Sequence, residues 1–347
     1  MERIDILSLT YEELLEEIIL MGEPKFRAKQ IFSWLHEKKV TEFGQMTTLS
    51  LPLRKRLEEK FCINALKITK RLASSIDDTV KYLYQLPDGN YVETVWMEYH
   101  HGVSVCVSTQ VGCRMGCQFC ASTIAGFVRN LTAGEILLQI YEAERDMGRR
   151  IDSIVLMGIG EPLDNYDNVI SFMRILSDPN GRGMSLRHVT LSTCGLVPKI
   201  YRLTEDVSGV TLSVSLHSPS DERRSEIMPV NRSYKIAELL EACRSYIKTT
   251  GRRVTFEYAV IEGINSAVQD AKALAALLRG MQCHVNLIPV NPIAERSFRG
   301  RRKTAELFQK TLEELGINAT VRRTLGSDIQ AACGQLRRNA HEEETRR

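Results

Sequence analysis

The alternation of two hydrophobic patterns from about residue 103 onward restricts the fold of this chain more than any other feature. Short apolar runs typical of strands alternate with segments whose apolar residues recur at helical spacing. The expected strands are Val103–Ser108, Ser153–Met157, His188–Ser192, Thr211–Leu216, Arg253–Val260 and Cys283–Pro289, with an additional one at Asn318–Arg323. The expected helices are Thr132–Met147, Tyr166–Leu176, Tyr234–Lys248, Ser266–Leu278 and Thr304–Leu315. Six such units predict an α/β fold, a parallel sheet curled into a partial (β/α)6 barrel with its active face at the carboxyl ends of the strands.

The first hundred residues follow a different pattern. Thr10–Met21 is typical of a helix that starts with a capping box, and two further helices are expected after Pro24 and over Leu53–Phe61. Alternating segments at Thr79–Leu86 and Tyr91–Tyr99 flank a turn sequence and predict a β-hairpin. We therefore expect an N-terminal helical module over residues 1–75, a β-hairpin extension over 76–102, the barrel over 103–336 and a C-terminal tail over 337–347.

Composition narrows the class of protein. The chain is 43% hydrophobic and 26% charged, which is ordinary for a globular protein, and its net charge is only +3. A surface that binds nucleic acid must therefore be a local patch. The longest apolar stretches are too short to cross a membrane, and the first residues lack the pattern of a secretory signal, so we expect a cytoplasmic protein. Nine cysteines, three of them within eight residues, favour metal or redox chemistry over a disulfide framework.

Those three clustered cysteines form the motif that carries chemistry. Cys113, Cys117 and Cys120 have the spacing C-x3-C-x2-C, and Phe119 precedes the third of them. Three thiolates on one loop suit three irons of a [4Fe-4S] cluster and leave the fourth iron open to chelate S-adenosylmethionine (SAM). The alternatives are a zinc site or three unrelated buried cysteines, but zinc prefers four ligands and no histidine or fourth cysteine follows closely. The motif therefore indicates a radical SAM enzyme, in which reduction of the cluster cleaves SAM to a 5′-deoxyadenosyl radical.

Polar residues and glycines at the ends of four expected strands predict where SAM would bind. Any one of them alone is more typical of a structural role, but four strand ends meet at one rim of such a barrel. Glycines there allow close approach of the backbone to the methionine part of SAM. The expected cofactor-binding residues are Gly160, Glu161, Ser192, Ser215, Leu216, His217 and Asn291.

Several longer segments carry a family resemblance over nearly the whole chain. They are Val92–Val95, Cys106–Gln110, Met157–Pro162, Ser213–His217, Asn286–Pro289 and Asp328–Leu336. In these segments the chain resembles the RlmN/Cfr family of radical SAM methyltransferases, which methylate adenosine in RNA.

The resemblance implies roles for three further residues. Cys333 would be methylated by one SAM, and a radical formed from a second SAM would take a hydrogen atom from that methyl group. The carbon radical would then attack the adenine, and Cys106 would resolve the protein–RNA adduct through a transient disulfide with Cys333. Glu93 occupies the family's proton-acceptor position. Taken without the resemblance, the two cysteines could equally be packing residues and Glu93 a solvated carboxylate on a strand.

The resemblance also implies the substrates and partners. Arg129–Leu131 and Ile288–Pro292 look more like the enzymes that methylate C2 than those that methylate C8, so C2 of adenosine 2503 in 23S rRNA is expected, with adenosine 37 of some tRNAs as a second substrate. The alternatives are C8 methylation, or a non-catalytic iron–sulfur protein that binds RNA or senses redox state. An electron donor such as flavodoxin or ferredoxin is implied, and a monomer is expected. Basic residues that could contact phosphates are Arg54, Lys55, Arg56, Arg296, Arg299, Arg301, Arg302 and Lys303.

Overall fold

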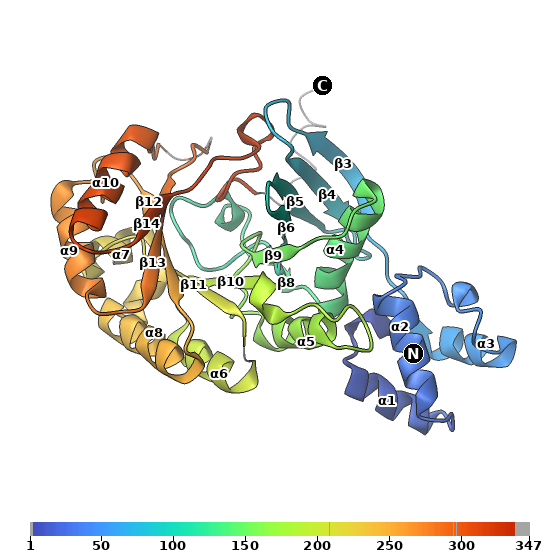
Figure 1. The fold of residues 1–347 in the computed structure, drawn as a ribbon. Coiled ribbons are helices and arrows are strands. Elements are labelled where there is room, and N and C mark those ends of the chain that lie inside the picture. The colour runs from blue at the N-terminus through green and yellow to red at the C-terminus, as the bar shows by residue number, and fades with distance from the viewer. Residues whose placement is uncertain (1–2, 208, 294, 296, 337–347) are drawn as a thin grey trace.

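A ten-stranded sheet runs through the computed structural model, which describes residues 3–207, 209–293, 295 and 297–336 (Figure 1). The expected tail over 337–347 and the expected phosphate contact Arg296 lie outside these residues. The strand order is β14-β13-β12-β11-β10-β9-β6-β5-β4-β3. These strands are β3 (Lys67–Ala73), β4 (Val80–Gln85), β5 (Tyr91–Tyr99), β6 (Gly102–Cys106), β9 (Ser153–Leu156), β10 (Val189–Thr193), β11 (Thr211–Ser215), β12 (Val254–Val260), β13 (Cys283–Pro289) and β14 (Ala319–Val321).

The parallel part of the sheet begins at β6 and continues to β14. Every neighbouring pair in this part is parallel, and β12 and β13 stay paired from Val254 opposite Cys283 to Val260 opposite Pro289. Helices connect the strands and cover their outer side (Figure 1). Since β14 and β3 are the two edges of the sheet, the barrel is open, and the expected α/β fold is confirmed. The connecting helices are α4 (Ala133–Met147), α5 (Tyr166–Ser177), α6 (Val197–Asp206), α7 (Asp221–Ile227), α8 (Ile236–Thr250), α9 (Val268–Leu278) and α10 (Arg302–Glu314).

Two of these helices were not expected from the sequence. The helix α6 buries Val197, Ile200 and Leu203 over only 10 residues, and α7 has 7 residues, most of them charged. Both are shorter than a barrel helix such as α4, which has 15 residues, so each gives a shorter periodic signal.

An antiparallel extension continues the sheet beyond β6. The expected hairpin is confirmed as β4 and β5, which pair from Val80 opposite Trp96 to Gln85 opposite Tyr91. The additional strand β3 pairs with β4 and lies within the range expected to be helical. Its side chains are mostly exposed, as befits an edge strand, so its sequence lacks the alternation that would have predicted it.

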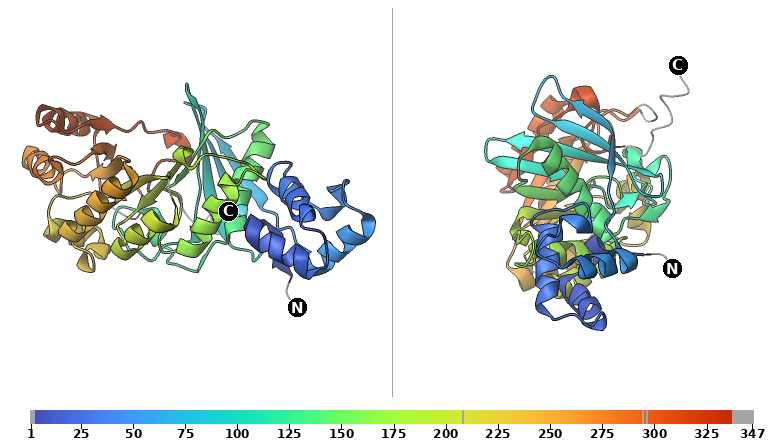
Figure 2. Two further views of the ribbon diagram at one scale, coloured as in Figure 1. Left: turned by 60° about the horizontal axis from the view of Figure 1, so that its bottom comes forward. Right: turned by 90° about the vertical axis from the view of Figure 1, so that its right-hand side faces the viewer.

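The N-terminal module packs at one end of the barrel (Figure 2). It contains α1 (Tyr11–Leu20), α2 (Phe26–His36), α3 (Leu51–Lys60) and a short parallel pair formed by β1 (Ile4–Asp5) and β2 (Phe61–Cys62). The capping box of α1 is present, with the Glu13 carboxylate accepting from the Thr10 amide at 2.8 Å. The module and the barrel share one hydrophobic core, and within the described residues no helix is long and apolar enough to span a bilayer.

Candidate active site

The three clustered cysteines lie on a loop that leaves the carboxyl end of β6. A two-stranded ribbon, β7 (Gln110–Val111) paired with β8 (Arg129–Asn130), closes the base of this loop. Gly112 has a φ of 75°, and a Cβ at this position would lie 1.7 Å from the carbonyl oxygen of Gly126. Only glycine allows the two sides of the loop to come this close.

The thiols of the loop are mostly buried and influence one another. The pKa of Cys113 is raised to about 12 by burial and by the nearby Cys120 thiol, and that of Cys117 is raised well above its ordinary value by burial, Cys120 and Cys113. Among the described residues, no three His, Cys, Asp or Glu side chains already stand together as ligands of a metal ion. The donor set nevertheless fits the predicted cluster, because three neighbouring thiols on one loop match the cysteine ligands of three irons, and a metal deprotonates the thiols it binds.

The loop after β9 contains two of the expected SAM-binding residues. At Gly160, where φ is 106°, a Cβ would lie 2.6 Å from the Cβ of Gln110, so the loop packs against the ribbon. Glu161 is only 4% exposed, and its carboxylate accepts from the amides of Leu163 at 3.0 Å and Cys194 at 2.7 Å. Burial raises the pKa of Glu161. Its carboxylate therefore joins the loops after β9 and β10, and a contact with SAM remains a prediction.

His217 connects the end of β11 to the cysteine loop. Its Nδ1 accepts from the Ala259 amide at 2.8 Å, which leaves the ring proton on Nε2. Burial and the nearby Arg224 lower the pKa of His217 to about 3, so the ring is neutral. The ring meets Phe119 edge-on, with 4.8 Å between the centroids. His217 thus supports the residue next to Cys120.

Arg224 is a fully buried cation that no sequence pattern marks. It donates to the carbonyl oxygens of Leu216 at 3.0 Å, Ser215 at 2.9 Å and Cys194 at 2.8 Å. It therefore joins the carboxyl ends of β10 and β11. The backbones of Ser215 and Leu216 are in this way held at the expected rim, while Ser192 lies half-buried within β10 itself.

Cys333 lies against the cysteine loop although 213 residues separate it from Cys120. The Ala121 amide donates to the carbonyl oxygen of Gly334 at 2.8 Å, and the Asn291 side-chain amide donates to that of Cys333 at 3.0 Å. Asn291, expected to bind SAM, is therefore placed beside Cys333. Asn291 and Cys333 line a small cavity together with Met97, Tyr99 and Arg322.

Two groups lie close to the Cys333 thiol. Cys106, on β6, is buried, and burial followed by the nearby Cys333 raises its pKa to about 12. Arg322, which the sequence did not mark, has a pKa raised by Cys333 and by Glu257, whose carboxylate lies 3.9 Å away, against the effect of burial. Cys106 also belongs to one hydrophobic cluster with Ala331, two residues before Cys333, so it lies near the segment that carries Cys333. The two cysteines are free thiols, and their transient disulfide remains a prediction.

Glu93 lies on β5 and forms a mostly buried ion pair with Lys81 at 3.0 Å. Lys81 also donates to the carbonyl oxygen of Gln330 at 3.3 Å. The pair therefore connects the antiparallel extension to the C-terminal segment that carries Cys333, and Glu93 is not a solvated strand carboxylate.

Most of the described basic residues expected to contact RNA are exposed, Arg54 is half-buried, and several of them have partners. Arg301 lies 3.4 Å from Glu262 and Arg302 lies 2.9 Å from Glu306. In the N-terminal module Arg56 pairs with Glu23 at 2.7 Å, and Arg54 donates to backbone carbonyls. Arg299, Lys303 and Lys55 are exposed as well.

Comparison with known proteins places this geometry in context. Residues 4–63 match the model of the ribosomal RNA large subunit methyltransferase N-terminal domain, and residues 107–275 match that of the radical SAM superfamily. Relatives from Alkaliphilus oremlandii (54% identical, covering 97% of this chain and 98% of that protein) and Lachnoclostridium phytofermentans (51%, covering 97% and 95%) are both called "Probable dual-specificity RNA methyltransferase RlmN". The crystal structure of a radical SAM methyltransferase from Sphaerobacter thermophilus superposes with a TM-score of 0.92 at 44% identity, covering 97% of this chain and all of the other.

Proposed function

The chain belongs to the RlmN family of dual-specificity radical SAM RNA methyltransferases, and on that premise we propose that it methylates C2 of adenosine 2503 in 23S rRNA and of adenosine 37 in some tRNAs. The observation that carries the proposal is the position of Cys333. The Gly334 carbonyl and the Asn291 amide hold the backbone of its segment against the cysteine loop, with Cys106 close by. This arrangement supports a reaction that passes through two cysteines.

The cofactors of the proposed reaction would be held by residues at the carboxyl ends of the strands. Cys113, Cys117 and Cys120 would hold three irons of the cluster, and the loop containing Gly160 would lie along SAM. When bound, these groups supply a radical able to remove hydrogen from a methyl group. C2 of adenine is a poor nucleophile, so direct displacement on SAM by that carbon fails, and a carbon carried by the protein overcomes this.

Three residues of the protein have different roles in the proposed reaction. Cys333 takes a methyl group from SAM on its sulfur and presents that carbon to the adenine. Glu93, which Lys81 holds in place, accepts the proton lost from C2. The adduct radical gives up one electron together with this proton, and that electron would return to the cluster, when bound. Cys106 bonds through its sulfur to the Cys333 sulfur, the bond from that sulfur to the transferred carbon breaks, and the carbon takes up a proton to become the new methyl group.

Variants of the two cysteines test this proposal. With Cys333→Ala we expect cluster assembly but no transfer, because no sulfur carries the methyl group. With Cys106→Ala we expect attack on RNA without release, leaving a covalent protein–RNA species that survives denaturation. Denaturing gel electrophoresis with labelled RNA detects the species, and the double variant, which cannot form it, is the control. Normal turnover by Cys106→Ala without an adduct would contradict the two-cysteine reaction.

Two further measurements separate the alternatives. Mass spectrometry of the modified adenosine against 2-methyl and 8-methyl standards distinguishes C2 from C8 methylation. A protein that only binds RNA or senses redox state would not cleave SAM when its cluster is reduced. We also infer from the family resemblance that flavodoxin or ferredoxin supplies the electron and that the protein acts as a monomer in the cytoplasm.

A further inference from the structure

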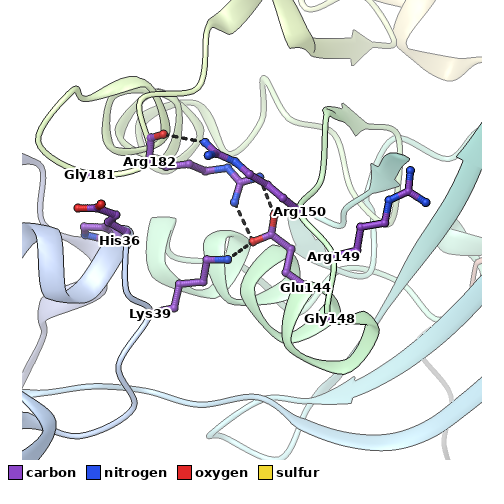
Figure 3. Close-up of a pocket in the computed structure, with 9 residues that line it drawn as sticks. His36, Lys39, Glu144, Gly148, Arg149, Arg150, Gly181 and Arg182 are labelled. Carbon is purple, nitrogen blue, oxygen red and sulfur yellow. Dashed lines mark hydrogen bonds and ion pairs between the residues drawn. The ribbon is translucent and has the colours of Figure 1, made fainter. Parts of the chain in front are cut away.

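A charged pocket lies between the N-terminal module and the barrel, at the amino-terminal ends of the parallel strands (Figure 3). One wall is the end of α2 with Lys39, and another is the end of α4 with Glu144. The third is formed by Arg150, just before β9, and by Arg182, in the loop between α5 and β10. The cysteine loop and Cys333 lie at the opposite, carboxyl ends of these strands. We call this site the junction pocket.

Positive charge exceeds negative charge around Glu144. Arg182 donates to both carboxylate oxygens, at 2.8 and 2.7 Å, and Lys39 also pairs with this carboxylate. Arg150 donates instead to the backbone oxygen of Arg182 at 3.0 Å, and among the described residues it has no ion-pair partner. Three cations therefore gather around the Glu144 carboxylate, as Figure 3 shows, while the other carboxylate that lines the pocket, that of Glu37, accepts from the Ser33 hydroxyl.

Two buried nitrogens of the pocket residues also have no hydrogen-bond partner within the described part of the chain. They are Nε of Arg182 and Nε2 of His36. The arginine nitrogen can only donate. The His36 ring is neutral, because burial lowers its pKa to about 3, and its Nδ1 shares a hydrogen bond with the Tyr141 hydroxyl at 3.1 Å. Nε of Arg182 is thus a buried donor without an acceptor among the described residues, and leaving such a group unpaired is costly.

A neighbouring pocket extends the same chemistry. The loop between α5 and β10 that provides Arg182 continues to Arg187, which lines a second cavity together with Arg174 and Arg252. None of these three arginines forms an ion pair with another described residue, and Nε of Arg252 is buried without a partner. Unpaired arginines thus continue along one end of the sheet in a chain whose net charge is only +3. Such a row suits a chain of phosphates better than a single small anion.

We propose that the junction pocket binds a backbone phosphate of the RNA substrate, at the end of the sheet opposite Cys333. This proposal rests on the proposed function, because it assigns a second point of contact to the same RNA. Arg150 supplies the unpaired charge, and Lys39 and Arg182, held by Glu144, supply fixed donors. Arginine suits this role because its planar guanidinium can give two hydrogen bonds to one phosphate.

The test compares two neighbouring arginines in the full-length protein. Arg150→Gln removes the unpaired cation, whereas Arg149→Gln removes an equal charge that already pairs with Glu98 at 2.7 Å and points away from Glu144 (Figure 3). Affinity for full-length tRNA and for a fragment of 23S rRNA is measured over a range of salt concentrations. For Arg150→Gln we expect the RNA affinity to be about tenfold weaker. The slope of log affinity against log salt concentration should fall by the equivalent of about one phosphate contact. Arg149→Gln should behave like the unchanged protein, and thermal unfolding checks that both variants fold.

Inorganic phosphate serves as a second, direct probe. At equal ionic strength, phosphate should stabilise the unchanged protein against heat more than chloride does, and Arg150→Gln should lose most of this gain. If the two arginine variants bind RNA alike, the proposal is wrong. If phosphate stabilises the protein through Arg150 but RNA affinity does not change, the pocket takes a free anion and the RNA assignment is wrong. Methylation at saturating RNA is measured separately, so a failure of the proposed function would appear there and leave the binding comparison intact.

Discussion

The two ends of the parallel sheet are built from different kinds of interaction. At the carboxyl ends, backbone amides and carbonyls hold the side chains, as for Glu161 and Arg224, and His217 is neutral. At the amino ends, side-chain charges meet directly around Glu144. Hydrogen bonds to the backbone fix the Glu161 and Arg224 side chains in place, whereas unpaired cations attract an anion. We therefore expect the reaction at the carboxyl ends of the strands and binding of the RNA backbone at their amino ends.

The largest expected effect tests the carboxyl end. Cys117→Ala should reduce iron from about four atoms per chain to a small fraction, because a cubane held at three irons loses one of its three ligands. SAM cleavage should disappear with it. Iron analysis and the visible absorption of anaerobically purified protein measure this change. As the control, Cys243→Ala alters a buried thiol on α8 and should keep its iron. Stoichiometric zinc with full activity would contradict the cluster.

A smaller effect is expected at the amino end. Glu144→Gln removes the carboxylate that holds Arg182 and Lys39, which leaves a buried guanidinium uncompensated. The free energy of unfolding should fall by about 3 kcal/mol near pH 7. Urea unfolding followed by the fluorescence of Trp34, in the N-terminal module, measures it. The control is Glu142→Gln, which breaks a more exposed pair with Arg145 and should cost less than about 1 kcal/mol.

The effect of Glu144→Gln should also depend on pH. Burial raises the pKa of Glu144, but hydrogen bonds and charge from Arg182, the Ile151 amide and Lys39 outweigh burial and bring the pKa below its ordinary value of 4.5. A lowered pKa in the folded protein means that the carboxylate stabilises the fold fully above about pH 4.5 and less as the pH falls through the folded value. The difference between variant and unchanged protein should therefore shrink in acid below pH 4.5. A constant difference would mean that lost packing, and not charge, causes the effect.

The smallest effect returns to the carboxyl end. Replacing Arg299, Arg301 and Arg302 with glutamine neutralises the exposed loop after β13. Two of these arginines already pair with Glu262 and Glu306. The slope of log RNA affinity against log salt concentration should therefore fall by the equivalent of only about one or two phosphate contacts. Fluorescence anisotropy with labelled tRNA measures it. SAM binding should stay as it was, and an unchanged salt dependence would show that the loop does not touch RNA.

Features that depend on neighbouring residues are predictable from the amino-acid sequence alone. The strands of the barrel appear within one or two residues of their expected bounds, since their periodicity is a local signal. The hairpin of β4 and β5 follows from its turn residues, and the spacing of Cys113, Cys117 and Cys120 places three thiols on one loop. Family resemblance added Cys333 and Cys106, which no local pattern marks.

Contacts between distant residues follow from the packing of the folded chain. It pairs Glu93 with Lys81, turns Glu161 toward the Cys194 amide, and brings Arg322 beside Cys333. It also adds β3, whose exposed edge carries no periodic signal, and assembles the junction pocket from residues as far apart as Lys39 and Arg182. Local spacing specifies elements because it reflects the repeat of one helix or strand. Contacts across the chain depend on how those elements pack, and no short stretch of sequence contains that information.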